Sequence, residues 1–131
     1  MKVTFFDRQL NSHPANGNTM SSVEELFSLL SQSTSRKSFF FELLGDNGYK
    51  ELIGFGEQSG CVQYSSIEGE PPYLMALSNN VEQEGFVDFL MGNTPTPISK
   101  RYCIEVEKVL EVASHFFKTG APYPLIGWEE T

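Results

Sequence analysis

The chain has 131 residues, of which 40% are hydrophobic and 13% aromatic, and its formal net charge is −8 at pH 7. This length and composition suit one domain, residues 1–131, with a hydrophobic core of its own. No apolar run is long enough to cross a membrane, and the acidic balance argues against a nucleic-acid-binding protein. The charge would attract a basic protein partner, although solubility alone is a sufficient reason for it.

The compartment is predicted from the first residues and the cysteines. Residues 1–7 lack the apolar segment and cleavage site of a signal peptide. Cys61 and Cys103 are the only two cysteines, and they form no disulfide or zinc-ligand pattern. We therefore expect a cytoplasmic protein with free thiols.

The first third of the chain predicts one strand and one helix. A strand candidate over 3–6 is followed by a polar, turn-rich stretch. Ser22 and Glu25 then fit a capping box. The apolar residues after them recur at three- and four-residue steps, which predicts a helix over 22–32.

The middle of the chain predicts an antiparallel meander of about five strands, because short apolar runs alternate with Gly- and Pro-containing turns. The expected strands are 38–44, 50–56, 61–66, 73–78 and 86–91. The Thr-Pro repeat over 94–97 predicts a stiff loop.

A second helix is predicted near the end of the chain. Its apolar stripe is Val106, Val109, Leu110, Ala113, Phe116 and Phe117. Gly120 is expected to be its left-handed C-cap, and Pro122 and Pro124 prevent continuation. The order of elements predicts an α+β fold, with both helices packed on one face of the sheet.

The turns of a meander emerge alternately at two ends of the sheet. We therefore expect the turns near 45–49 and 66–72 and the loop 92–99 to share one rim. The turns near 57–60 and 79–85 are expected at the opposite rim. Carboxylates are present at both rims: Asp46, Glu68 and Glu70 at the first, and Glu57, Glu82 and Glu84 at the second.

The sequence contains no catalytic signature. Cys103 and His115 could serve as nucleophile and base, but their spacing gives no reason to expect contact. Two histidines in the whole chain do not support a metal site. The aromatic residues Tyr64, Tyr73, Phe86, Phe89 and Tyr102 could line a ligand pocket, although core packing explains them as well. We expect neither an enzyme nor a cofactor.

Several segments, in order and spacing, resemble a bacterial immunity-protein family that is encoded beside polymorphic toxins. The segments are Leu52-Ile53-Gly54-Phe55-Gly56, Val62-Gln63-Tyr64-Ser65, Pro71-Pro72-Tyr73-Leu74, Gly92-Asn93-Thr94-Pro95-Thr96-Pro97-Ile98, Arg101-Tyr102-Cys103, His115-Phe116-Phe117-Lys118-Thr119-Gly120 and Trp128-Glu129-Glu130. The family's characteristic tryptophan corresponds to Trp128, and Tyr102 belongs to the same structural signature. The similarity extends from about residue 39 to residue 131.

The resemblance implies a non-catalytic inhibitor of a cognate toxin, in a 1:1 complex. The toxins of this family are typically deaminases, including cytidine deaminases that act on double-stranded DNA. The alternative is a small-molecule-binding or regulatory domain that uses an aromatic-lined sheet.

The toxin-binding surface is predicted from the chemistry of the turns. The loop 67–73 combines carboxylates, prolines and a tyrosine, so that it is stiff before binding. We predict contacts by Asp46, Glu68, Glu70, Tyr73 and Asn93, with the rim around Glu82 and Glu84 as the alternative. Trp128 is expected to be mainly buried, with Glu129 nearer the solvent.

Overall fold

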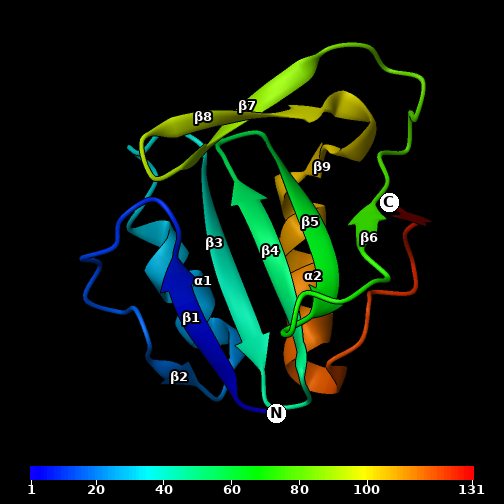
Figure 1. Cartoon of the computed structure of the whole chain (residues 1–131). Helices are drawn as coiled ribbons and strands as arrows, with labels where there is room; N and C mark the ends of the chain where they lie inside the picture. The colour runs from blue at the N-terminus through cyan, green and yellow to red at the C-terminus, as the bar shows by residue number, and fades with distance from the viewer.

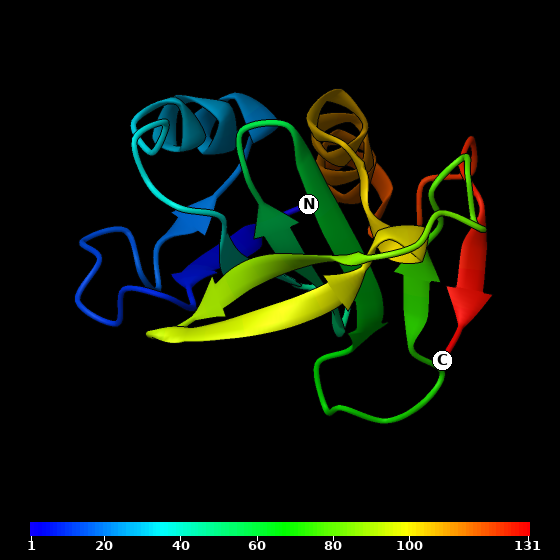
Figure 2. The ribbon, with the colours of Figure 1, turned by 90° about the horizontal axis from the view of Figure 1, so that it is seen from above.

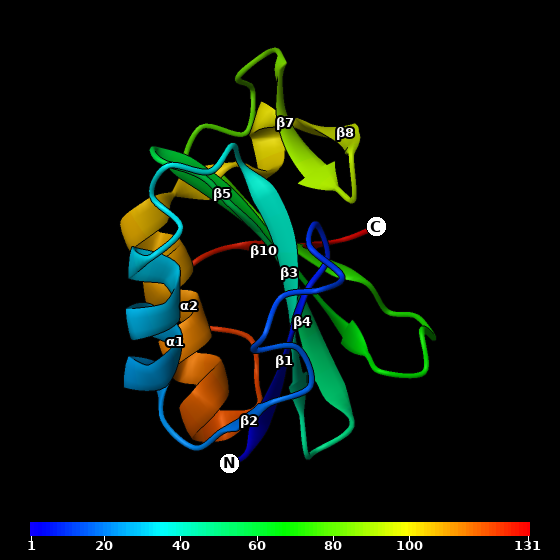
Figure 3. The same cartoon turned by 90° about the vertical axis from the view of Figure 1, so that its left-hand side faces the viewer.

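Two helices lie side by side on one face of a twisted sheet in the computed structural model, which describes all 131 residues (Figures 1 and 3). The helices are α1 (Val23–Ser31) and α2 (Val106–Thr119), with a short 3-10 helix at Lys100–Tyr102. The strands are β1 (Val3–Asp7), β2 (Thr19–Met20), β3 (Phe39–Gly45), β4 (Tyr49–Phe55), β5 (Ser59–Ser66), β6 (Leu74–Ala76), β7 (Phe86–Met91), β8 (Thr94–Ser99), β9 (Ile104–Glu105) and β10 (Trp128–Glu130). The predicted α+β class is confirmed.

The sheet is larger than the five strands expected. Its ten strands follow the order β10-β6-β5-β4-β3-β1-β2, with β7, β8 and β9 attached beside this path. The antiparallel run β3-β4-β5-β6 is the predicted meander. The count was too low because β2, β9 and β10 have two or three residues each, which is too short for a visible alternation.

The β7–β8 hairpin departs from the meander. It crosses the face of the sheet opposite the helices (Figure 2) and touches β3 at one parallel pair, Phe39 with Leu90. The predicted loop 94–97 is wrong, because it lies within β8, which pairs with β7 along its whole length. The other side of β8 pairs with no strand, and an unpaired edge tolerates proline, which lacks an N–H group.

The main core lies between the helices and the sheet. From α2 it buries Val109, Val112, Ala113, Phe116 and Phe117, which confirms most of the predicted stripe. The sheet contributes the alternate residues of its central strands, among them Phe41, Leu43, Ile53 and Val62. The helix ends at Gly120, whose φ of 71° is the left-handed conformation expected there.

A smaller cluster holds the hairpin against the opposite face of the sheet. Phe89 of β7 packs against Phe40 of β3, with ring centroids 5.6 Å apart, and Cys61 and Met75 complete the cluster. This contact joins residues far apart in the sequence. The alternation of apolar residues along the chain therefore does not predict the position of the hairpin.

Candidate protein-binding surfaces

Most basic side chains of the protein are neutralised by acidic neighbours. Arg8 and Lys50 both pair with Glu42, and the other pairs are Arg36–Asp7, Arg101–Glu129 and Lys108–Glu111. The lysines outside these pairs are Lys2, Lys37, Lys100 and Lys118.

Exposed carboxylates greatly outnumber these four lysines. Twelve acidic residues are exposed and form no ion pair: Glu24, Glu25, Asp46, Glu57, Glu68, Glu70, Glu82, Glu84, Asp88, Glu105, Glu107 and Glu130. The negative charge of the sequence is therefore a property of the surface, where it can attract a cationic molecule.

The 67–73 loop is exposed and is held by its own hydrogen bonds. The Ser66 hydroxyl accepts a bond from the Glu70 amide at 3.1 Å, and the Tyr73 hydroxyl donates to the Gly69 carbonyl. The Ile67 amide donates to the Gly48 carbonyl in the β3–β4 turn, at 2.9 Å. The loop therefore presents Glu68 and Glu70 to the solvent, whereas Tyr73 is half-buried and its hydroxyl is already bonded.

Only part of the predicted contact set shares one rim. The bond between Ile67 and Gly48 brings the turn that contains Asp46 to the 67–73 loop. Asn93 lies elsewhere, in the turn of the β7–β8 hairpin, and the Gly92 amide beside it donates to the Arg8 carbonyl. The expected grouping of Asn93 with Asp46 is wrong, because the hairpin crosses the sheet instead of extending the meander.

The opposite rim carries Glu82 and Glu84 in the 77–85 loop. Arg101 fixes this loop through its carbonyl, which accepts from the Ser78 amide at 2.8 Å, and through Nη1, which donates to the Val81 carbonyl at 3.1 Å. Val81 and the adjacent Phe86 are 37% and 68% exposed. A contact surface at this rim would use these apolar side chains at its centre and the carboxylates at its margin.

A groove of about 790 Å³ lies beside the 77–85 loop. The loop, the segment 125–127 and the start of α2 form its walls. Its apolar lining comprises Leu77, Val81, Val87, Ile104, Leu125 and Ile126. Leu125 is 77% exposed, so this groove offers apolar contact area that the fold itself does not use.

Tyr102 and Trp128 both fix the strand β10. The Tyr102 hydroxyl donates to Glu129 at 2.6 Å, and Arg101 forms an ion pair with the same carboxylate. These hydrogen bonds, first from Arg101 and then from Tyr102, lower the pKa of Glu129 to about 2. The sequence did not predict this clamp, because its partners are more than twenty-five residues apart.

Trp128 is buried in large part, in keeping with the expected burial. It is half-buried against the main core, and its indole nitrogen donates to the Tyr123 carbonyl at 2.8 Å. Glu129 is half-buried too, and the clamp binds its carboxylate. Successive side chains of β10 point to opposite faces of the sheet, and both faces are covered in part.

The residues considered for catalysis do not meet. The Cys103 thiol lies near the carbonyls of Ile98 and Ser99, at 3.9 and 3.5 Å, whereas the His115 ring packs against Tyr123. Burial raises the pKa of the Cys103 thiol, which opposes formation of a nucleophilic thiolate. No cluster of three or more His, Cys, Asp or Glu residues could hold a metal ion. Neither helix is long and apolar enough to span a membrane.

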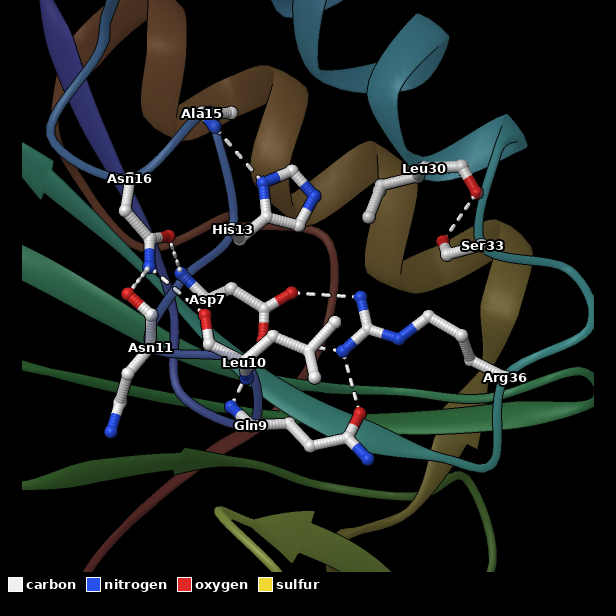
Figure 4. A network of polar contacts seen from close by, with 10 residues as sticks. All are labelled: Asp7, Gln9, Leu10, Asn11, His13, Ala15, Asn16, Leu30, Ser33 and Arg36. Atoms are coloured by element: carbon white, nitrogen blue, oxygen red, sulfur yellow. Dashed lines mark hydrogen bonds and ion pairs between the residues drawn. The ribbon is translucent and has the colours of Figure 1, made fainter.

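Asp7 is a buried carboxylate with a structural role (Figure 4). It accepts from Arg36 Nη1 at 2.8 Å and from the amides of Gln9 and Leu10 at 2.9 and 2.8 Å. Burial opposes its ionisation, but the bonds from Arg36 and the backbone outweigh burial and lower the pKa of Asp7. With all these partners, Asp7 ties the segment before β3 to the end of β1.

Glu51 is the opposite case. It is fully buried in β4 and neither carboxylate oxygen has a hydrogen-bond partner. Its register places it between Leu43 of β3 and Tyr64 of β5, on the face covered by the helices. Burial raises the pKa of Glu51 well above its ordinary value. Sequence reasoning missed this residue because an isolated glutamate in a strand is usually exposed.

A second cavity lies between α1 and α2 and has a volume of about 420 Å³. Its apolar lining consists of Phe27, Leu30, Phe39, Phe55, Val106 and Leu110. Arg36 also lines it, with its guanidinium 3.6 Å from the Phe39 ring centroid. Of the aromatic residues proposed for a ligand pocket, none contributes to this cavity.

The chain matches no protein-family model, and no curated protein matches it.

Proposed function

We propose that this protein is an immunity protein that binds and inhibits a cognate toxin in the cytoplasm, in a 1:1 complex, and that it is not an enzyme. The toxin is a nucleic-acid deaminase of the kind that the sequence resemblance implies. One observation carries the proposal: twelve exposed carboxylates without ion pairs stand against four lysines.

The charge suits this partner because a deaminase that grips DNA presents cationic groups around its catalytic pocket. An acidic inhibitor is steered to such a face and competes there with the phosphates of the substrate. The 67–73 loop is suited to this contact, since it protrudes with Glu68 and Glu70 exposed and is stiffened by its internal bonds. A protective complex requires nanomolar affinity or better, about −12 kcal/mol.

Co-expression tests the proposal. The cognate toxin domain is expressed in cells with and without the protein, and survival and cytosine deamination of the DNA are measured. We expect full protection. Killing that continues in the presence of the folded protein would contradict the proposal.

The contact surface is tested by charge reversal. Glu68→Lys combined with Glu70→Lys should slow toxin association and leave the melting temperature nearly unchanged, because both side chains are exposed and unpaired. The matched control is Glu24→Lys with Glu25→Lys, at the start of α1. Equal association of both variants would exclude the 67–73 loop, and Glu82 and Glu84 would then be the next pair to reverse.

The cavity between α1 and α2 favours a second candidate function, the binding of a small apolar ligand. Its volume of about 420 Å³ lies within the range of ligand sites, about 300–1,000 Å³. Leu110→Trp would fill this cavity at the outer side of α2. If the second candidate is correct, apolar ligands raise the melting temperature of the wild type and not of Leu110→Trp.

A further inference from the structure

The strand β10 has an unpaired outer side. It is the last strand at one end of the sheet and pairs only with β6 (Figure 2). The Leu77 amide donates to the Gly127 carbonyl and the Thr131 amide to the Tyr73 carbonyl, both at 2.9 Å. These two bonds fix which residues of β10 face β6.

Residues of an antiparallel strand alternate between facing the partner strand and facing away from it. Gly127 and Thr131 bond to the residues opposite them on β6 and its flanks, so Glu129 between them also faces β6. The N–H and C=O groups of Trp128 and Glu130 therefore point outward. No turn or loop hydrogen bond engages the main chain of either residue.

The other ends of the sheet are less suited to accept a strand. The free side of β8 contains Pro95 and Pro97, which have no N–H group to offer. At the far end β2 has only two residues. In contrast, β10 continues the register from Gly127 to Thr131 without a proline.

The two ends of this edge carry groups that suit a partner with both basic and apolar side chains. At one end Glu130 is exposed opposite Leu74, directly after the 67–73 loop with Glu68 and Glu70. At the other end Gly127 and Leu125 line the groove. The two flanks are only about three residues, or about 10 Å, apart.

We propose that the cognate toxin adds an extended segment to the outer side of β10, through main-chain bonds to Trp128 and Glu130. The segment carries basic side chains toward Glu68, Glu70 and Glu130, and an apolar side chain that enters the groove beside Leu125. The identity of the partner rests on the proposed function. A second copy of this chain is disfavoured, because a second chain of net charge −8 would bring further carboxylates, and not basic groups, toward Glu68, Glu70 and Glu130.

Amide hydrogen exchange tests the pairing. The ¹⁵N-labelled protein is measured alone and with an equimolar, catalytically inactive toxin domain. We expect the amides of Trp128 and Glu130 to exchange at least about tenfold more slowly in the complex. The amides of Glu129 and Thr131 face β6 and should be protected in both states. Unchanged exchange at Trp128 and Glu130 within a formed complex would overturn this inference and leave the proposed function intact.

A pair of variants separates main-chain pairing from simple coverage of the edge. Glu130→Pro removes the outward N–H group, whereas Glu130→Ala removes only the carboxylate. Both should fold, because position 130 donates no bond to β6 and edge strands tolerate proline. We expect Glu130→Pro to bind the toxin at least about fivefold more weakly than Glu130→Ala, because only the proline removes a main-chain hydrogen bond. Equal affinities would refute strand pairing, and absence of any complex with the wild type would refute the proposed function as well.

Discussion

The buried carboxylate of Glu51 should make the stability of the protein depend on pH in an unusual direction. Its side chain is fully buried, both oxygens lack partners and burial raises its pKa well above the ordinary 4.5. The folded protein therefore binds the carboxyl proton of Glu51 more tightly than the unfolded chain does. By linkage, the contribution of Glu51 to the free energy of unfolding falls as the pH rises from about 4.5 toward the folded-state pKa.

The size of the effect follows from the missing hydrogen bonds. A buried polar group without a partner costs about 1–3 kcal/mol, and more if it is charged. Replacement by an apolar side chain of similar length removes this cost, so Glu51→Leu should stabilise the fold by about 1–3 kcal/mol at pH 8. For a domain of this length each kcal/mol corresponds to a shift in melting temperature of about 3–5 °C.

The assay is denaturant unfolding at pH 5 and pH 8 for the wild type, Glu51→Leu and Glu51→Gln. The stability gain of both variants over the wild type should be larger at pH 8. At that pH only the wild type must either keep Glu51 protonated or bury its charged carboxylate. Glu57→Gln, at an exposed position after the same strand, is the control and should show no such difference. A gain that is equal at both pH values, or a loss of stability in Glu51→Leu, would refute the reasoning.

Three further predictions concern the bonds of Arg101 and Tyr102 to Glu129, the burial of Trp128 and the effect of salt. The lowered pKa of Glu129, about 2, means that its ionised form stabilises the fold above the ordinary carboxyl pKa, and this stabilisation is lost as the pH falls through 2. Glu129→Gln should therefore lose less stability below pH 4.5 than the wild type does. Acid titration followed by circular dichroism checks this. Trp128→Ala should destabilise the half-buried site by about 1–3 kcal/mol, less than a full core truncation; unchanged melting with lost toxin binding would instead make Trp128 an interface residue. Toxin association should slow as salt is raised from 0.05 to about 0.3 M, as stopped-flow measurements would show, and a salt-independent rate would argue against charge steering.

The parts of the fold that the sequence predicted are those with strong local periodicity. The helix over 22–32 is α1 at Val23–Ser31, and the expected strands 38–44 and 50–56 match β3 and β4 within about one residue at each end. Gly120 ends α2 as expected, because only a left-handed residue fits there. These elements are determined by neighbours in the sequence.

The rest depended on contacts between distant residues. The packing of Phe89 on Phe40 carries the β7–β8 hairpin across the sheet, and this separates Asn93 from the rim of Asp46. The two prolines of β8 resembled a loop because a free edge cannot be recognised before the sheet order is known. The burial of Glu51 and the pairing of Glu129 with Arg101 have no local signal at all.

Inhibition of a nucleic-acid deaminase, as proposed, is tested most directly by titrating the activity of the toxin with this protein. The purified toxin domain is incubated with double-stranded DNA and increasing amounts of this protein, and the conversion of cytosine to uracil is measured. The proposal predicts that deamination falls linearly and stops when the two proteins are equimolar. Deamination that persists at full rate with an excess of the folded protein would contradict it.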